Sequence, residues 1–145
     1  MKSSLHNIIF YVIIAGDDQT DHVFLRKAMN KLVPQAIVES LYEPGETITF
    51  LQKHSPVPHL IFLDQNMIAR GGSRMLQLIR DTEEFKHVPV IILTEDKLHF
   101  TKNDLVRYGA DEFYPKPYHA KTLDQIVSDL RERWFSSMFN QRNSA

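Results

Sequence analysis

The amino-acid sequence predicts an α/β fold, in which a five-stranded parallel sheet carries helices on both faces. Short runs of apolar, mostly β-branched or aromatic residues, as at 8–15 and 60–63, are typical of strands covered on both faces. Segments with apolar residues at helical spacing separate these runs. Strands that alternate with helices build parallel sheets, and this alternation decides the fold class.

In the first half of the chain, local signals place each element. The run at 8–15 flows into Gly16-Asp17 without a small-residue cleavage site, so it suits a buried strand better than a signal peptide. Pro34 ends the following helical pattern, and Pro44-Gly45 marks a turn. The expected elements are a strand at 8–15, a helix at 20–32, a strand at 36–41 and a helix at 46–53.

In the second half, Gly71-Gly72 marks a loop, Ser73 is placed to cap a helix, and Gly109 stops another. The last helix carries a stripe of apolar residues that ends with Trp134. The expected elements are a strand at 60–63 ending at Asp64, a helix after Ser73, a strand at 88–93 ending at Thr94, a helix at 104–108, a strand at 113–114 and a helix at 122–135.

Composition indicates one domain over residues 1–145, with a core at about 8–135 and a polar tail at 136–145. The 17 Lys and Arg nearly balance the 18 Asp and Glu, so direct nucleic-acid binding is not expected. The chain has no cysteine, which excludes disulfides and thiolate chemistry. No apolar run reaches the ~18 residues of a membrane helix, so a cytoplasmic location is the default expectation.

Charged residues stand at the ends of three predicted strands. Gly16-Asp17-Asp18 follows the first strand, Asp64 ends the third, and Lys116-Pro117 follows the fifth. Parallel sheets place their sites at the carboxyl ends of the strands. We therefore expect these side chains to form one charged site at a single edge of the sheet.

The residue types at this edge suit phosphoryl chemistry. Acids that converge without a cation repel one another, and Mg²⁺ is held by one or two carboxylates with waters and phosphoryl oxygens. Lys116 offers a point charge to a phosphoryl oxygen, and the Thr94 hydroxyl offers a hydrogen bond to another. Asp64 is a candidate nucleophile, because carboxylates form aspartyl-phosphate intermediates.

These residues in this order resemble the receiver domain of two-component response regulators. The likeness covers about Ile8 to Phe135, including Asn66-Met67, Gly109-Ala110 and the strand-end residues above. It implies a flavodoxin-like fold with strand order 2-1-3-4-5, bound Mg²⁺, and phosphorylation of Asp64 by a histidine kinase or phosphotransfer protein. Such a protein catalyses only its own phosphotransfer and dephosphorylation, and is otherwise not an enzyme.

The resemblance also implies roles for single residues. Thr94 and Phe113 match the pair that changes position on phosphorylation, after which the face of the fourth helix, fifth strand and fifth helix exchanges protein partners. Asn66 and Asp96 flank the path of the attacking water and are expected to set the lifetime of the phosphoryl group. Asn66 also matches the residue whose backbone carbonyl binds the metal. The closest likeness is to stand-alone, chemotaxis-type receivers, which often pair as dimers through the same face; the downstream protein partner is not specified.

The sequence departs from the family pattern at the end of the first strand. Asp17 aligns with the second acid of the family pair, Gly16 stands in place of the first, and Asp18 is an extra acid that also suits a helix N-cap. We therefore expect Asp17 and Asp64, with Asp18 as a further candidate, to bind Mg²⁺ more weakly than a full set. Ile68 and Gly71 replace a common proline and a common acid.

These departures motivate an alternative, a pseudo-receiver that acts as a phosphorylation-independent interaction module. A small flavodoxin-like binder or hydrolase is the weakest alternative, because the chain has no glycine-rich cofactor loop.

Overall fold

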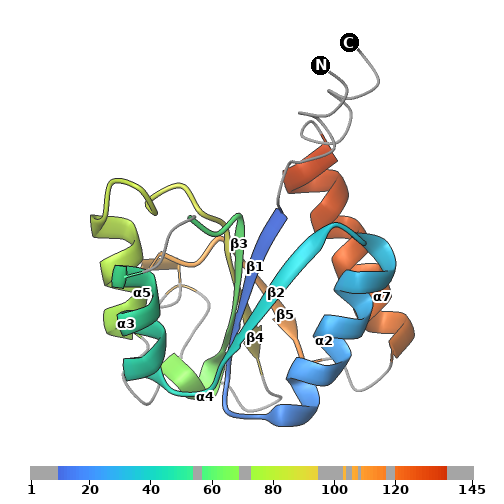
Figure 1. The fold of residues 1–145 in the computed structure, drawn as a ribbon, viewed down its shortest axis with the longest axis horizontal. Helices are drawn as coiled ribbons and strands as arrows, with labels where there is room; N and C mark the ends of the chain where they lie inside the picture. The colour runs from blue at the N-terminus through green and yellow to red at the C-terminus, as the bar shows by residue number, and fades with distance from the viewer. Residues whose placement is uncertain are drawn as a thin grey trace.

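A computed structural model of the chain shows a single five-stranded parallel sheet with helices on both faces (Figure 1). It describes residues 10–53, 57–68, 73–94, 103, 106–107, 109–116 and 120–136. The strand order is β2-β1-β3-β4-β5, which is the order that the sequence predicts. The elements are β1(Phe10–Ala15), α2(Gln19–Leu32), β2(Ala36–Leu41), α3(Pro44–Lys53), β3(Leu60–Asp64), α4(Gln65–Met67), α5(Ser73–Asp81), β4(Val90–Thr94), β5(Glu112–Pro115), α7(Ala120–Leu130) and the π-helical turn η2(Arg131–Phe135).

Two apolar cores lie on opposite faces of the sheet. Successive side chains of a strand point to opposite faces, so β1 contributes Ile13 to one core and Val12 to the other. Helices α3 and α5 cover the first face, and α2 and α7 cover the second (Figure 1). Because every residue of β1, β3 and β4 is buried, these strands read in the sequence as continuous apolar runs.

Several element boundaries differ from the sequence prediction. Pro44 and Gly45 form the first turn of α3 instead of a separate turn, since a proline at the first helical position loses no intrahelical hydrogen bond. Residues 65–67 form a short helix that the sequence analysis does not include. The fourth strand begins at Val90, two residues later than expected, because Pro89 lacks the N–H group that a central strand donates.

The last helix is longer than expected at its start and changes character at its end. α7 begins at Ala120, and residues 131–135 form a π-helical turn. Trp134 is exposed, whereas the rest of the predicted apolar stripe is buried, since the indole nitrogen donates a hydrogen bond to the Glu112 carboxylate at the rim of the sheet. Gly71-Gly72, Asp96 and Pro117 lie outside the described residues, as does most of the helix predicted at 104–108.

The strand register brings the predicted site residues to one edge. Ala15 pairs with Leu63, Asp64 with Leu93, and Thr94 with Pro115, so the carboxyl ends of four strands lie side by side. Helix α2 begins beside this edge because the Asp18 side chain accepts a hydrogen bond from the Thr20 N–H at 2.9 Å. The end of the sheet and the start of a helix therefore meet next to Asp64.

Candidate functional site

Asp64 lies at the centre of the charged edge and is almost completely buried. It ends β3, and its Oδ1 accepts a hydrogen bond from the Asn66 N–H at 2.9 Å, which makes Asp64 the N-cap of α4. Its Oδ2 lies 2.7 Å from Lys116 Nζ. One carboxylate oxygen is thus held by the backbone and the other by a single ammonium group.

Lys116 follows β5 and turns its ammonium group into the site. Its side chain is 4% exposed, and its backbone N–H donates to the Thr94 carbonyl at 2.6 Å. Burial lowers the pKa of this ammonium, but two carboxylates beside it outweigh burial and raise the pKa above its ordinary value. Lys116 is therefore a permanent positive charge in the site.

The second carboxylate is Asp21, which the sequence analysis does not include. It lies in the first turn of α2, with Oδ2 at 3.0 Å from Lys116 Nζ. Burial raises the pKa of Asp21, the Lys116 ammonium lowers it, and the nearby carboxylates of Asp18 and Asp64 raise it again. An acid three residues after an N-cap is common as a helix-capping pattern, so its position in the sequence gave no signal of a role in the site.

Gly16 lies against Asp64, and the fold explains why a side chain is absent there. A Cβ added at Gly16 would lie 3.0 Å from Asp64 Cβ and 3.4 Å from its Oδ2. The Gly16 carbonyl also lies 2.8 Å from His22 Nε2, and the buried His22 ring packs against Tyr42. A larger residue at the end of β1 would therefore require the Asp64 side chain to shift by a few tenths of an ångström.

Two acids, Asp17 and Asp18, directly follow Gly16. Asp17 is exposed in the loop before α2. Asp18 is also exposed, and its carboxylate caps the helix, which is the alternative role that its sequence position suggests. Asp21, the third acid of this region, lies 3.0 Å from Lys116 Nζ.

Thr94 and Phe113, the residues matched to the switch pair, lie on neighbouring strands. Thr94 is buried, and its hydroxyl donates to the Tyr114 carbonyl at 3.3 Å. Phe113 is half-buried and packs against the core beneath α3 and α5. The threonine hydroxyl is therefore bonded to the backbone of β5, one residue beyond the aromatic side chain.

The described residues at this edge offer few carboxylate ligands to a divalent cation. Asp64 Oδ2 is buried and lacks a well-directed hydrogen bond, although Lys116 lies beside it. Within the described residues, no cluster of three or more His, Cys, Asp or Glu side chains has the geometry to hold a metal. This donor set suits an ion that keeps most of its waters, as Mg²⁺ does.

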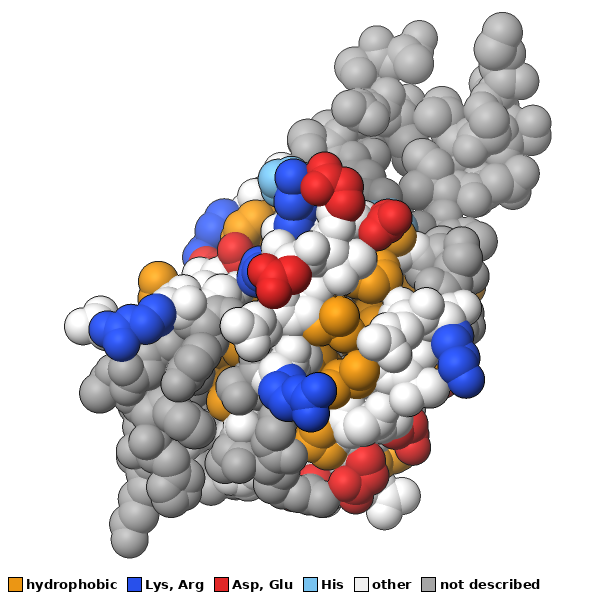
Figure 2. All heavy atoms as spheres, turned by 90° about the vertical axis from the view of Figure 1, so that its left-hand side faces the viewer, with side chains coloured by type: hydrophobic (Ala, Val, Ile, Leu, Met, Phe, Trp, Pro, Cys, Tyr) orange, Lys and Arg blue, Asp and Glu red, His pale blue; other side chains and the backbone are white. Residues whose placement is uncertain are grey.

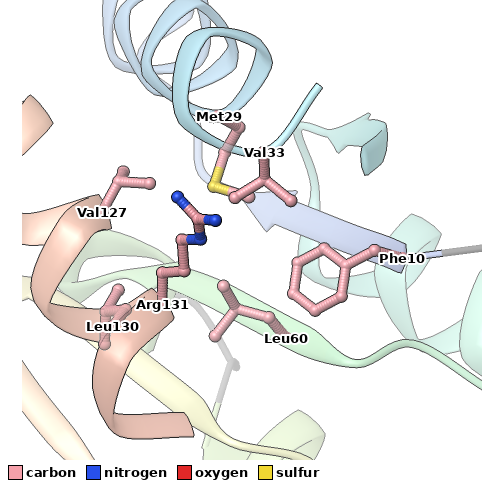
Figure 3. Close-up of a pocket in the computed structure, with 7 residues that line it drawn as sticks. All are labelled: Phe10, Met29, Val33, Leu60, Val127, Leu130 and Arg131. Carbon is pink, nitrogen blue, oxygen red and sulfur yellow. The ribbon is translucent and has the colours of Figure 1, made fainter. Parts of the chain in front are cut away.

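Two other concave regions of the described residues are lined mainly by apolar side chains. Between α3 and α5, hydrophobic side chains form a band along a groove of about 370 Å³ lined by Leu51, Val57, Leu78 and Phe85 among others (Figure 2). Between α2 and α7, Met29, Leu60, Val127 and Arg131 help to enclose a cavity of about 10 Å³ (Figure 3). That cavity has room for about one water molecule, so it is not a cofactor site.

Comparison with known proteins agrees with this geometry. A family model described as the response regulator receiver domain matches residues 12–128. The chain belongs to the response regulator receiver domain family. Receiver domains are signalling proteins of two-component systems, which pair with histidine kinases, and this assignment confirms the predicted family.

Relatives of this receiver domain occur alone and within longer proteins. It is 22% identical over 134 residues to the response regulator Rcp1 of Synechocystis sp., covering 88% of this chain and 90% of Rcp1. It is 29% identical over 122 residues to the sensor histidine kinase CheAY of Helicobacter pylori, covering 81% of this chain. The match spans 14% of CheAY, so it concerns one part of a much longer protein.

Solved receiver structures share the fold. The phosphorylated cyanobacterial phytochrome response regulator RcpA superposes with a TM-score of 0.74 at 20% identity, covering 90% of this chain and 96% of that one. The Mn²⁺-bound form of Rcp1 superposes with a TM-score of 0.69 at 22% identity, covering 86% and 94%. These matches confirm the flavodoxin-like arrangement.

Across the described residues, no helix is long and apolar enough to cross a membrane.

Proposed function

We propose that this receiver domain accepts a phosphoryl group on Asp64 from a histidine kinase or phosphotransfer protein, and that phosphorylation switches a protein-interaction face. The observation that carries the proposal is the buried Asp64 carboxylate with Lys116 Nζ at 2.7 Å, at the carboxyl edge of the sheet. A buried acid beside a buried cation is an arrangement typical of functional sites.

The reaction is an in-line phosphoryl transfer. A carboxylate oxygen of Asp64 attacks the phosphorus atom of a phosphohistidine, the new O–P bond forms, and the P–N bond breaks. The imidazole leaves with the bonding electron pair. Lys116 then contacts an oxygen of the transferred group, where its fixed charge stabilises the negative charge that builds up in the transition state.

We propose that Asp64, Asp17 and the Asn66 backbone carbonyl hold Mg²⁺, with Asp18 as a further candidate. The bound ion would neutralise charge on the transferred phosphoryl group. Asp17 is exposed at the rim of the site, which suits binding through water. Because Gly16 supplies no carboxylate, we expect weak Mg²⁺ affinity.

The proposed switch starts from the hydrogen bond of Thr94. In the structure its hydroxyl donates to the Tyr114 carbonyl at 3.3 Å, a long and therefore weak bond. A phosphoryl oxygen on Asp64 is a stronger, charged acceptor. Rotation of Thr94 toward it would free space beside β5 for Phe113, and would shift a pre-existing equilibrium between two states. Asp96, outside the described residues, stays a candidate for tuning the phosphoryl lifetime together with Asn66.

Mass spectrometry of the protein treated with acetyl phosphate and millimolar Mg²⁺ tests the proposal. We expect a phosphoryl adduct that maps to Asp64 and that disappears in Asp64→Asn, whose amide is a poor nucleophile. Asp81→Asn is the matched control, because it also converts an aspartate to asparagine but removes an exposed acid at the end of α5, outside the proposed site.

The pseudo-receiver is the second candidate, and the close packing of Gly16 on Asp64 favours it. Absence of any adduct on the wild-type protein with acetyl phosphate, and of beryllofluoride binding in millimolar Mg²⁺, would contradict phosphorylation. That result would leave phosphorylation-independent interaction as the function of this face.

A further inference from the structure

We propose that Asp21 is a positioning residue that competes with the phosphoryl group for Lys116, and thereby limits how readily Asp64 becomes and stays phosphorylated. The inference rests on the proposed function, because it concerns the phosphorylated state of Asp64. It adds a residue outside the predicted site and gives it a role opposite to that of a catalytic group.

The contacts show one ammonium group shared by two carboxylates. Lys116 Nζ lies 2.7 Å from Asp64 Oδ2 and 3.0 Å from Asp21 Oδ2. The Lys116 and Asp64 side chains are each 4% exposed, and that of Asp21 is 18% exposed. Little water is therefore available to screen these charges from one another.

Asp21 has no competing task that would explain its orientation. The N-cap of α2 is Asp18, whose carboxylate accepts the hydrogen bond from Thr20. Asp21 Oδ2 is buried without a well-directed hydrogen bond, and its contact is with the lysine. Asp21 thus brings a carboxylate to the edge where Gly16 supplies none, but it brings it from the helix side.

Phosphorylation changes the balance between the two carboxylates. The transferred group carries up to about two negative charges at neutral pH. It needs Lys116 as a partner, and it repels the Asp21 carboxylate, which contacts the same ammonium group. Asp21 therefore weakens the phosphorylated state twice, by repulsion and by neutralising the lysine.

An opposite effect, in which Asp21 helps by holding Lys116 in place, is the smaller of the two. Lys116 is already held by burial, by Asp64, and by the hydrogen bond from its backbone N–H to the Thr94 carbonyl. Removal of one of several constraints costs little, whereas repulsion between close, poorly screened like charges is large. The expected net effect of Asp21 is to disfavour phosphorylation.

The test compares the wild-type protein with Asp21→Asn and Asp81→Asn. Each variant removes one acid from a helix, and of these two residues Asp21 contacts Lys116, whereas Asp81 is exposed at the end of α5. With subsaturating acetyl phosphate and fixed Mg²⁺, intact-mass measurement gives the phosphorylated fraction, and its decay after donor removal gives the half-life. Beryllofluoride affinity, measured by NMR titration, gives a second readout, and circular dichroism checks folding.

For Asp21→Asn we expect an increase of about tenfold in the ratio of phosphorylated to free protein, together with tighter beryllofluoride binding. Asp81→Asn should match the wild type. A gain separates this role from a structural one, because damage to the fold would lower adduct formation. Asp21→Ser, also uncharged, should repeat the gain.

An unchanged or lower adduct level in both Asp21 variants, with the wild type phosphorylated, overturns this inference and leaves the proposed function intact. An equal gain in Asp81→Asn also overturns it, because general charge would then explain the effect. Failure of the wild-type protein to form an adduct overturns the proposed function, and the inference with it.

Discussion

Two clusters of opposite charges lie at opposite ends of the sheet, and they differ in how fully their polar atoms are paired. At the amino ends of β4 and β5, Arg80 donates to the carbonyls of Gly109, Lys86 and Val88, and to Asp111. Asp111 Oδ2 also accepts from the Val90 N–H at 2.8 Å. These hydrogen bonds connect α5 to the amino ends of β4 and β5.

At the carboxyl ends of the strands, the Lys116 ammonium group contacts the carboxylates of Asp21 and Asp64. The Oδ2 atoms of these two carboxylates, which face the lysine, lack well-directed hydrogen bonds. Buried polar atoms are usually fully bonded, and exceptions are often functional. The comparison teaches that one cluster is fully paired and stabilises the fold, whereas the other leaves carboxylate oxygens whose pairing is incomplete, as the proposed phosphoryl chemistry requires. Substitutions in the two clusters should therefore have different consequences.

The largest expected effect is on stability, at the amino-end cluster. Arg80→Ala removes four hydrogen bonds and the cationic partner of Asp111, so we expect a loss of about 3 kcal/mol in the free energy of unfolding. Chemical denaturation measures this loss. Below its unfolding transition, the variant should still accept a phosphoryl group on Asp64.

Lys86→Ala is the matched control for this substitution. Its ion pair with Glu83 at 3.0 Å is largely exposed to solvent, and such pairs are worth less than about 1 kcal/mol. Equal destabilisation by the Arg80 and Lys86 substitutions would contradict the distinction between the Arg80–Asp111 cluster and an ordinary surface ion pair.

The next largest loss of stability is expected at Gly109, whose carbonyl accepts a hydrogen bond from Arg80 in the same cluster. Its φ is +108°, and an added Cβ would lie 2.7 Å from Arg80 Cγ. We expect Gly109→Ala to cost about 2 kcal/mol, because both the backbone and the arginine must shift. Gly45→Ala is the control: Gly45 lies in the first turn of α3 with no atom within 4 Å of an added Cβ. It should be neutral or slightly stabilising, and a similar loss at both glycines would refute the steric argument.

The smallest expected effect is a pH-dependent gain of stability at the carboxyl-end cluster. Burial raises the pKa of Asp21 above its ordinary value of 3.8, so its contribution to stability is fullest below that pH and is lost as the pH rises through the folded-state pKa. Asparagine carries no charge at any pH. Asp21→Asn should therefore be slightly more stable than the wild type at pH 7.

Denaturation measured from pH 3 to pH 7 checks this prediction, since the difference between variant and wild type should grow with pH. A difference that stays constant over this range would show that Asp21 carries no charge penalty in the fold. Together with the Arg80 result, it would also show that the two clusters do not differ in the way their contacts suggest.

Much of the fold could be predicted from the sequence because the signals are local. Buried strands such as β1 and β3 are continuous apolar runs, and Asp18 and Pro34 mark the two ends of α2 by their own backbone chemistry. The boundaries at Pro44 and Val90 were missed, since proline permits either a turn or a first helical position, and apolar residues continue past the start of a strand.

The site was predicted in part for the same reason. Asp64, Thr94 and Lys116 directly follow or end strands, so sequence order alone places them at one edge. Asp21 and His22 come from a helix, and their contacts with Lys116 and Gly16 depend on how α2 is set against the end of β1. No spacing in the sequence encodes that placement.

The sequence by itself determined the alternation of strands and helices, the parallel sheet and the charged edge, because burial and strand ends are properties of neighbouring residues. Only the tertiary structure decided which acid shares Lys116, how tightly Gly16 packs on Asp64, and which cluster of charges is fully bonded. Those outcomes depend on distances of a few ångströms between segments far apart in the chain, and packing of the whole domain sets such distances.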